Sequence, residues 1–313
     1  MKTIRLIPDK TNIRFLEKRK LALTLSICLV VLSFALFFGR GLNLGIDFLG
    51  GILLEVKTDG PADIADLRIK INYLNLGDTS LQEFGAKDTV LIRVQRQKGG
   101  DDAQKLAVDK IKEGLGSSVI EYRRTEFVGP TVGAELKEAA IWAVLAAVGA
   151  ILLYIWFRFE WQFGVGAVIA LTHDVITTIG LFALLQLEFN VSTVAAVLTI
   201  AGYSINDTVV VYDRVRENLR RYKRLSLIEL FNRSINETLA RTVMTSVTTL
   251  LALLALFFFG GEVIRGFSIA LIWGVFVGTY SSIALAVPLL VFLNIDRRTL
   301  SETEEVEKVE SGS

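Results

Sequence analysis

Two aspartates, Asp174 and Asp207, interrupt long stretches that otherwise contain no Asp, Glu, Lys or Arg. A charged side chain is costly inside a membrane, so an ionisable residue there is expected to serve a function. Asp207 stands in the polar run 202–208, seven residues before Arg214, which places it about 10 Å inside a helix that reaches the surface there. Because burial disfavours the charged form, this carboxyl group could gain and lose a proton in working conditions.

Arg241 opens another apolar stretch, at a depth similar to that of Asp207. A nearby cation favours the ionised carboxylate, so an arginine that approaches and withdraws with conformation is sufficient to couple proton transfer to movement. We therefore predict that Asp207 and Arg241 form a proton-coupling pair on neighbouring helices. In the alternative interpretation, the helix ends near Ile205 and Asp207 caps a following amphipathic helix.

Four further polar residues are candidates for relaying protons: His173, Asp174, Asn206 and Asp213. Asp174 lies about 21 Å deep by helix geometry, and its alternative role is a structural hydrogen bond to a neighbouring helix. For Asp213, which stands beside two arginines, an interfacial ion pair is the favoured interpretation. No catalytic residue, cofactor or metal is predicted, because single His and Cys residues exclude histidine-rich metal sites and internal disulfides.

Six stretches are long and apolar enough to position these residues on membrane-spanning helices. Of the 313 residues, 52% are hydrophobic and 21% are charged, whereas charged residues make up about a quarter of an ordinary soluble chain. A helix needs about 20 apolar residues to cross the hydrocarbon core. The windows are 21–39, 139–157, 161–187, 189–212, 242–261 and 266–295. We predict an α-helical integral membrane protein with six transmembrane helices, and a net charge of +1 gives no general case for binding nucleic acid.

The distribution of Lys and Arg predicts the orientation in the membrane, because these residues are retained on the cytoplasmic side. Residues 1–20 contain seven Lys or Arg, and residues 214–233 contain another seven. Residues 186–190 contain none, and residues 260–265 contain one. We therefore expect both termini to be cytoplasmic. The first window has no signal-peptide cleavage site and is expected to remain as an anchor.

Residues 40–138 have the composition of a water-soluble domain, with 14 Lys or Arg and 16 Asp or Glu. The apolar pattern predicts a strand at 51–56, a helix at 62–76, a hairpin of 81–84 with 89–94, a helix at 102–115 and a strand at 119–127. This βαββαβ order is that of a ferredoxin-like α+β domain. We place it outside the membrane, on the extracytoplasmic side, inserted between the first and second transmembrane helices.

Two cytoplasmic segments complete the domain organisation. Residues 214–240 form a basic loop, and the apolar residues interleaved at 214–238 favour an amphipathic helix lying at the anionic leaflet. The alternative is a solvated loop that only sets the topology. Residues 296–313 are rich in glutamate and are expected to be a disordered acidic tail.

Four motifs closely resemble the SecF family of bacterial protein-export membrane subunits. They are Gly-Ile-Asp-Phe-Leu-Gly-Gly at 45–51, Val-Gly-Pro-Thr-Val-Gly-Ala-Glu-Leu at 128–136, the run 201–218 around Asn-Asp, and Ser-Ile-Asn-Glu-Thr-Leu-Ala-Arg-Thr at 234–242. By motif position, the resemblance places the family's coupling carboxylate on Asp207 and its arginine on Arg241.

The resemblance implies a hetero-complex with SecD, which has a similar six-helix half, in an assembly like that of the resistance-nodulation-division transporters. It also implies association with the SecYEG channel, with YajC and YidC as further partners, in the bacterial cytoplasmic membrane. The expected function is to use the proton-motive force to promote the movement of exported polypeptides on the extracytoplasmic side.

Two other classes of function remain open from the residues alone. An intramembrane aspartyl protease would need two carboxylates within a few ångströms, and Asp174 with Asp207 is the available pair. The depths of these two residues differ by about 10 Å, and no Gly-x-Gly-Asp stretch is present. A purely structural channel scaffold would tolerate Asn in place of Asp207.

Overall fold

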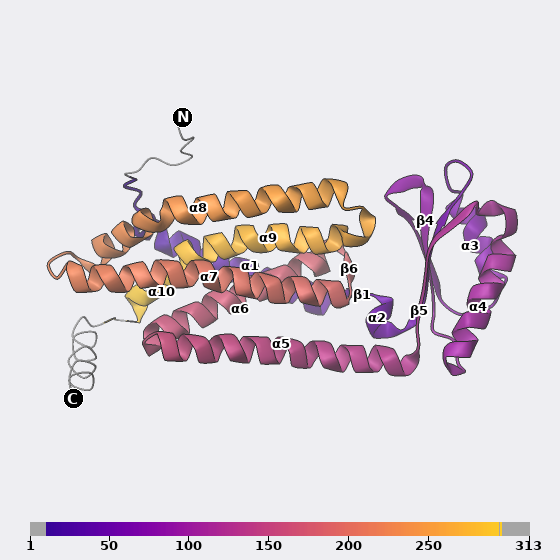
Figure 1. The fold of residues 1–313 in the computed structure, drawn as a ribbon, viewed down its shortest axis with the longest axis horizontal. Coiled ribbons are helices and arrows are strands. Elements are labelled where there is room, and N and C mark those ends of the chain that lie inside the picture. Colours follow the sequence, from indigo (N-terminus) through magenta and orange to yellow (C-terminus); the bar gives the residue numbers. More distant parts are fainter. Residues whose placement is uncertain (1–10, 294, 296–313) are drawn as a thin grey trace.

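The computed structural model describes residues 11–293 and residue 295. The expectations for residues 1–10 and for the acidic tail at 296–313 lie outside this range. A bundle of long helices makes up most of the molecule, and a small sheet domain lies at one end of it (Figure 1). We call the end of the bundle next to the sheet domain the proximal end and the opposite end the distal end.

The bundle contains six helices that are long and apolar enough to cross a membrane, as the sequence predicts. They are α1 (Arg19–Arg40), α5 (Pro130–Arg158), α6 (Trp161–Leu185), α7 (Val191–Arg221), α8 (Leu227–Phe259) and α9 (Arg265–Ser281), the last of which continues through a π turn (Ser282–Ala286) into α10 (Val287–Phe292). A short 3-10 helix, η1 (Phe15–Lys18), precedes α1, and another, η3 (Glu262–Ile264), precedes α9.

Burial divides these helices into two groups. About half of the most apolar window is buried in α6, in α7 and in the helix formed by α9 and α10. The corresponding windows of α1, α5 and α8 are buried by only 11%, 6% and 11%. Apolar side chains that lie outside a protein core in a membrane helix face lipid or another protein. The first group therefore forms the interior of the bundle, and the second group lies around it.

The sheet domain has the ferredoxin-like order that the sequence predicts. Its elements are β2 (Gly51–Lys57), α3 (Ile64–Asn72), β3 (Thr79–Phe84), β4 (Ala86–Val94), α4 (Gly100–Leu115), a short 3-10 helix η2 (Gly116–Ser118) and β5 (Glu121–Val128). The strands pair antiparallel in the order β3-β4-β2-β5. Helix α3 is shorter than predicted, because Asp63 caps its start and the chain turns after Tyr73.

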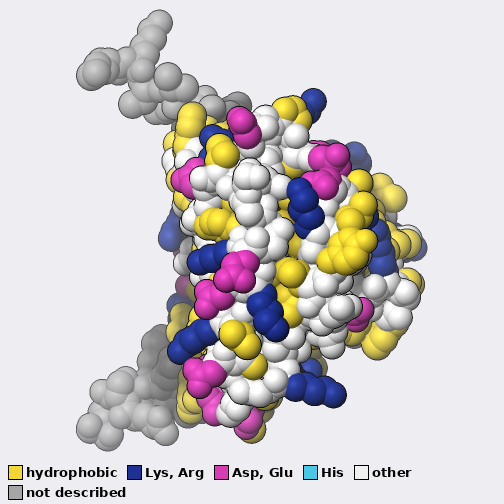
Figure 2. Space-filling view, turned by 90° about the vertical axis from the view of Figure 1, so that its right-hand side faces the viewer, with side chains coloured by type: hydrophobic (Ala, Val, Ile, Leu, Met, Phe, Trp, Pro, Cys, Tyr) yellow, Lys and Arg dark blue, Asp and Glu magenta, His cyan; other side chains and the backbone are white. Residues whose placement is uncertain are grey.

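The domain has a core of its own between the sheet and its two helices. Apolar residues of β2, β4 and α4 are almost fully buried there, among them Ile52, Val90 and Ile111. Figure 2 looks onto the end of the molecule that this domain forms, where Lys and Arg alternate with Asp and Glu over the surface. Such a mixed charged surface is typical of a domain in water.

A short parallel strand pair joins the domain to the proximal end of the bundle. Strand β1 (Asn43–Leu44) follows α1 and pairs with β6 (Glu188–Phe189), which precedes α7. One turn of helix, α2 (Ile46–Leu49), connects β1 to the sheet domain. These three elements are not predictable from the sequence, since none of them is long enough to show a hydrophobic period.

Most of residues 214–240 is helical rather than a loop, which corrects the expectation for this segment. Helix α7 continues to Arg221, and after a break at residues 222–226 α8 begins at Leu227. The two helices lie side by side at the distal end (Figure 1). Arg214 binds Glu237, and Asn218 binds Ser234 and Glu237. A separate amphipathic helix along the membrane and a solvated loop are therefore both wrong.

Candidate functional site

Helix α7 carries Asp207 into the interior of the bundle without a break. Asp207 is the seventeenth residue of a 31-residue helix, so the alternative in which it caps a second helix is wrong. The side chain is only 4% exposed. Its Oδ2 atom has no hydrogen-bond partner among the described residues. A buried carboxylate oxygen without a donor is costly, so this group is suited to protonation or to an approaching donor.

Arg241 on α8 lies close enough to Asp207 for its charge to act on the carboxylate. Within the described chain, the two side chains form no ion pair in this conformation. The side chain of Arg241 is exposed on the surface of the bundle. The next residue, Thr242, is fully buried, and its hydroxyl also has no partner among the described residues. Asp207 and Arg241, the pair predicted from the sequence, therefore lie on neighbouring helices but form no ion pair in this conformation.

Asp174, in contrast, is fully buried and fully bonded. Its Oδ2 accepts hydrogen bonds from Ser204 of α7 and from Ser281 of α9, the latter at 2.7 Å. Its Oδ1 lies 2.9 Å from Nδ1 of His173. The side chain of Asp174 on α6 thus joins three helices, because it accepts hydrogen bonds from α7 and from α9. This is the structural role that the sequence analysis left open beside the relay.

A seam of hydroxyl groups continues from Asp174 along α7 and α9. Ser204 is three residues before Asp207, and the next residue, Thr208, has its hydroxyl 2.9 Å from that of Ser282. A Cβ atom at Gly278 would lie 3.1 Å from Cβ of Ser204, so the two helices cross closely here. The hydroxyl groups therefore connect the surroundings of Asp174 and Asp207 through one face of α7.

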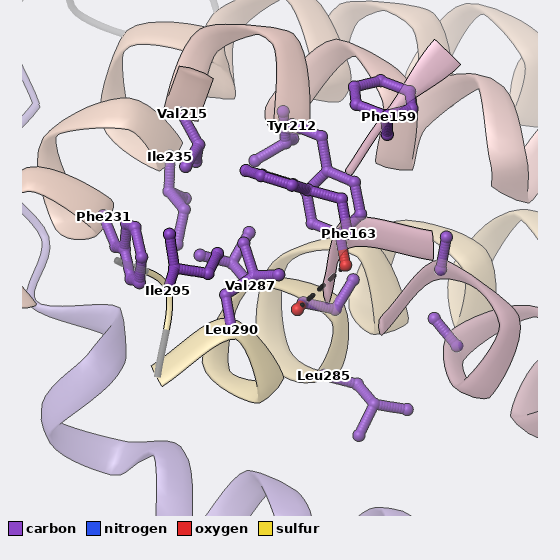
Figure 3. Close-up of a cluster of buried hydrophobic side chains, with 14 of the residues drawn as sticks. Phe159, Phe163, Tyr212, Val215, Phe231, Ile235, Leu285, Val287, Leu290 and Ile295 are labelled. Carbon is purple, nitrogen blue, oxygen red and sulfur yellow. Dashed lines mark hydrogen bonds between the residues drawn. The ribbon is translucent and has the colours of Figure 1, made fainter. Parts of the chain in front are cut away.

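Directly after α9, one of the two helices along this seam, the chain forms a π turn at Ser282–Ala286. Pro288 follows and cannot donate to the carbonyl four residues earlier, so regular α-helical bonding is broken at this point. The hydroxyl of Tyr212 on α7 donates to the carbonyl of Ala286 at 3.1 Å (Figure 3). Single π turns within α-helices are frequent at functional sites, and this one borders the helix that carries Asp207.

Tyr212 belongs to the apolar core at the distal end of the bundle. It is fully buried, and its ring meets those of Phe159 and Phe163 edge-on. Figure 3 shows Leu285, Val287 and Leu290 on the other side of the same cluster. A Cβ atom at Gly166 would overlap the Tyr212 hydroxyl. Glycine at this position therefore makes room for the hydrogen bond to Ala286.

The other two candidate relay residues lie outside this arrangement. Asn206 is exposed on the surface of α7. Asp213 pairs with Arg158 of α5 at 2.7 Å, and both side chains are about two-fifths exposed. The interfacial ion pair expected for Asp213 is therefore present, although its partner is on another helix.

The joint between the bundle and the domain contains a polar residue that the sequence analysis did not select. Asp47 accepts a hydrogen bond from the backbone N–H of Val191 at 3.0 Å, and Val191 is the first residue of α7. Four N–H groups at a helix start lack partners within the helix, so this carboxylate stabilises the start of α7. An aspartate three residues before the first of two adjacent glycines was the available signal.

Glycines and ion pairs fix the rest of the joint. Gly50 and Gly51 have φ angles of +71° and +123°, and a Cβ at Gly51 would lie 2.7 Å from the carbonyl oxygen of Val94. Arg93 of β4 binds Glu188 at 2.6 Å and Asn43 at 3.1 Å. The domain is therefore attached to the proximal ends of α1 and α7 together.

Comparisons with known proteins give the family. A model described as "Protein export membrane protein SecD/SecF, C-terminal" matches residues 107–296, and one described as "SecD/SecF GG Motif" matches residues 35–62. The protein translocase subunit SecF of Rickettsia bellii is 46% identical over 295 residues, which cover 93% of this chain and 97% of the relative. The chain belongs to the SecF family. The SecF of Rhodobacter capsulatus is 45% identical over 308 residues, covering 94% of this chain and 92% of its own length.

Two solved structures show the same architecture in this family. The crystal structure of SecDF, a translocon-associated membrane protein from Thermus thermophilus, matches with a TM-score of 0.83 at 38% identity. The match covers 92% of this chain and 39% of the SecDF chain. SecDF in a super-membrane-facing form matches with a TM-score of 0.67 at 37% identity, covering 95% and 40%. This SecF-family chain thus spans about two-fifths of the length of SecDF.

The glycine motif of the family coincides with the joint. Its matched range contains the end of α1, the strand β1, Asp47, Gly50 and Gly51. In this SecF-family chain, the motif holds the sheet domain to the start of α7, which carries Asp207 further along.

Proposed function

We propose that the chain is an accessory subunit of protein export that couples proton transfer at Asp207 to movement of the sheet domain. Proton-motive force drives the cycle, and the moving domain promotes the passage of polypeptides that emerge from the SecYEG channel. The single observation that carries this proposal is the buried carboxyl group of Asp207, which lies near Arg241 and whose Oδ2 has no hydrogen-bond partner in the described part of the chain.

The chemistry of the pair supports a two-state device. A protonated Asp207 needs no cation and is compatible with the interior of the bundle. An ionised Asp207 draws in Arg241, so α8 packs differently against α7 in the two states. The joint then transmits a displacement of α7 to the domain through Asp47. Unequal matches to two forms of SecDF at nearly equal identity are in keeping with more than one shape in the family.

Orientation and partners follow from the same proposal. The distal end is cytoplasmic because the basic residues gather there, and the sheet domain is extracytoplasmic. SecD supplies the second half of the assembly, since this chain spans about two-fifths of SecDF. YajC and YidC are further partners. The chain has no catalytic residue of its own in this proposal, and its site binds a proton rather than a chemical substrate.

A protease is not favoured by the geometry. In the part of the chain that the structure describes, no hydrogen bond joins Asp174 to Asp207, and the Asp174 carboxylate is engaged by two serines and His173. An aspartyl protease requires two carboxylates that share one proton.

The test is export into inverted membrane vesicles that contain the SecD complex, with and without a proton gradient. Asp207→Asn keeps the size of the side chain and cannot titrate, so we expect assembly with SecD and gradient-independent export to persist while stimulation by the gradient disappears. Arg241→Met is expected to do the same.

The matched control is Asp102→Asn, which makes the same chemical change on α4 at a side chain that is 98% exposed. It should leave stimulation unchanged. Full stimulation in Asp207→Asn vesicles would show that this carboxyl group is not the coupling group.

A further inference from the structure

Residues 11–18 form a strap that lies across the distal end of α8 before the chain enters α1. Helix α8 otherwise packs mainly against α7 and α9. The strap is therefore the principal place where the start of the chain contacts the helix that carries Arg241. The contact joins residues that are more than 200 positions apart in the sequence.

Asn236 of α8 binds the backbone of the strap on both of its polar groups. Its Oδ1 accepts from the N–H of Ile13 at 2.9 Å, and its Nδ2 donates to the carbonyl of the same residue at 2.8 Å. The side-chain amide thus pairs with one peptide residue as a neighbouring strand would. The hydroxyl of Thr11 also donates to the backbone carbonyl of Asn236, at 3.4 Å.

Asn232, one turn earlier on α8, caps the short helix η1 from outside. The residue before η1, Arg14, makes no capping hydrogen bond with its side chain. The Oδ1 of Asn232 instead accepts from the N–H of Leu16 at 3.0 Å. Leu16 is fully buried and belongs to the distal core with Phe231. The contact is therefore specific in its hydrogen bonds and anchored by an apolar residue.

The two asparagines lie between Arg241 of α8 and the start of α1. Arg241 follows Asn236 by five residues, about 7.5 Å further along α8. On the other side, η1 continues directly into α1, which ends at Arg40 and leads into β1 at the joint. A displacement of the distal part of α8 can therefore reach the sheet domain along α1, besides the route through α7.

We propose that Asn232 and Asn236 are positioning residues that make α8 and α1 move together, so that a shift of Arg241 is transmitted to the sheet domain through the strap. This inference rests on the proposed function, since it names a second connection of the same proton-coupling pair. Each asparagine acts through the strap backbone and through Arg241, and neither touches Asp207.

The test uses the full chain in complex with SecD, in vesicles, with Cys28→Ser as the parent and a single cysteine at Gln82. Gln82 is exposed and lines a cavity of about 490 Å³ between the domain and the proximal ends of α7 and α9. The rate at which this cysteine reacts with a membrane-impermeant maleimide reports on that cavity. Export is measured on the same vesicles.

We expect a proton gradient to change the labelling rate and to stimulate export in the parent. In Asn232→Ala/Asn236→Ala both responses should disappear, while gradient-independent export persists. The matched control is Asn12→Ala, whose exposed side chain makes no hydrogen bond to the rest of the described chain. This variant should behave as the parent does.

Parent-like responses in the double variant would overturn the proposal, and so would loss of the responses in Asn12→Ala. Failure of the parent to show stimulated export would instead count against the proposed function itself. The two failures are therefore distinguishable.

A covalent link keeps the proposal falsifiable if the double variant does not accumulate. Cysteines at Ile13 and Asn236, in the chain without Cys28 and with Gln82 unchanged, can be joined by a short bifunctional thiol reagent. The cysteine at Asn236 removes the hydrogen bonds to Ile13, so the unbridged protein should show reduced stimulation of export, and the bridge, which holds the strap to α8 again, should restore it. Stimulation that falls on bridging and returns when the reagent is cleaved would show that the strap must separate from α8 and would overturn the proposal.

Discussion

Asp174 and Asp207 are the same residue type in the same bundle, yet their surroundings fit them for different work. Asp174 has hydrogen-bond partners for both oxygens, on its own helix and on two others. Asp207 has an oxygen that none of the residues at 11–293 or 295 donates to, and the charge of Arg241 acts on it without an ion pair. A carboxylate with partners on both oxygens fixes a structure, whereas one with an unbonded oxygen favours a second arrangement. We therefore assign Asp174 to holding α6, α7 and α9 together, and Asp207 to gaining and losing the coupled proton.

Asp174→Asn tests this assignment. The amide oxygen can still accept from a serine, but the hydrogen bonds to a charged group are lost, which should lower the free energy of unfolding by about 1–3 kcal/mol. We expect a lower unfolding temperature in detergent and retained stimulation of export by the proton gradient. Two results would instead identify Asp174 as a relay residue. One is an unchanged unfolding temperature of Asp174→Asn with no stimulation of export. The other is normal export from Asp207→Asn together with loss of stimulated export in Asp174→Asn.

At the scale of elements, α6 and α7 pack closely against the π turn in the distal core. Gly166 leaves space for the Tyr212 hydroxyl, which binds the carbonyl of Ala286. Overpacking of this kind typically costs about 1–3 kcal/mol. We predict that Gly166→Ala lowers the unfolding temperature of the complex, and that adding Tyr212→Phe, which removes the hydroxyl, restores part of the loss.

Gly164→Ala is the control on the same helix. Its Cβ would lie 3.6 Å from Ile155, an ordinary contact, so its unfolding temperature should stay at or slightly above that of the parent. Equal unfolding temperatures for the two alanine variants would show that the space beside Tyr212 is not needed.

The elements that could be predicted from the sequence are those with a long local pattern. The six apolar helices and the βαββαβ order are visible because each repeats a period over many residues. The helical ends of α7 and α8 at residues 214–240 were wrongly predicted as a loop. Arg214 and its neighbours indicate a membrane surface, but they do not show that the helix continues past it. The glycine pair after Asp47 marks a special backbone but does not reveal the partner of Asp47, and Asn236 has no local signal, since their partners lie 144 and 223 residues away. Asp207 and Arg241 were selected as candidates because intramembrane charge is rare, and their role stays a prediction.

The whole molecule has two chemically distinct ends, and the proposed orientation can be checked on them. A reporter enzyme fused at Lys98, in the sheet domain, should read as extracytoplasmic, and one fused at Lys223, between α7 and α8, should read as cytoplasmic. The physical reason is the retention of Lys and Arg on the cytoplasmic side. The opposite result at either position would overturn the six-span orientation.

Helix α5 is the longest continuous connection from the domain to the distal end, with 29 residues and a length of about 43 Å. Only 6% of its apolar window is buried against the rest of the chain. Lipid tails are as apolar as leucine, so sliding or turning such a helix exchanges one hydrocarbon neighbour for another. Its displacement therefore breaks few packed contacts within the chain. The start of α5 packs against α2 at the joint, so we expect the sheet domain to turn about the joint while the rest of α5 moves through lipid.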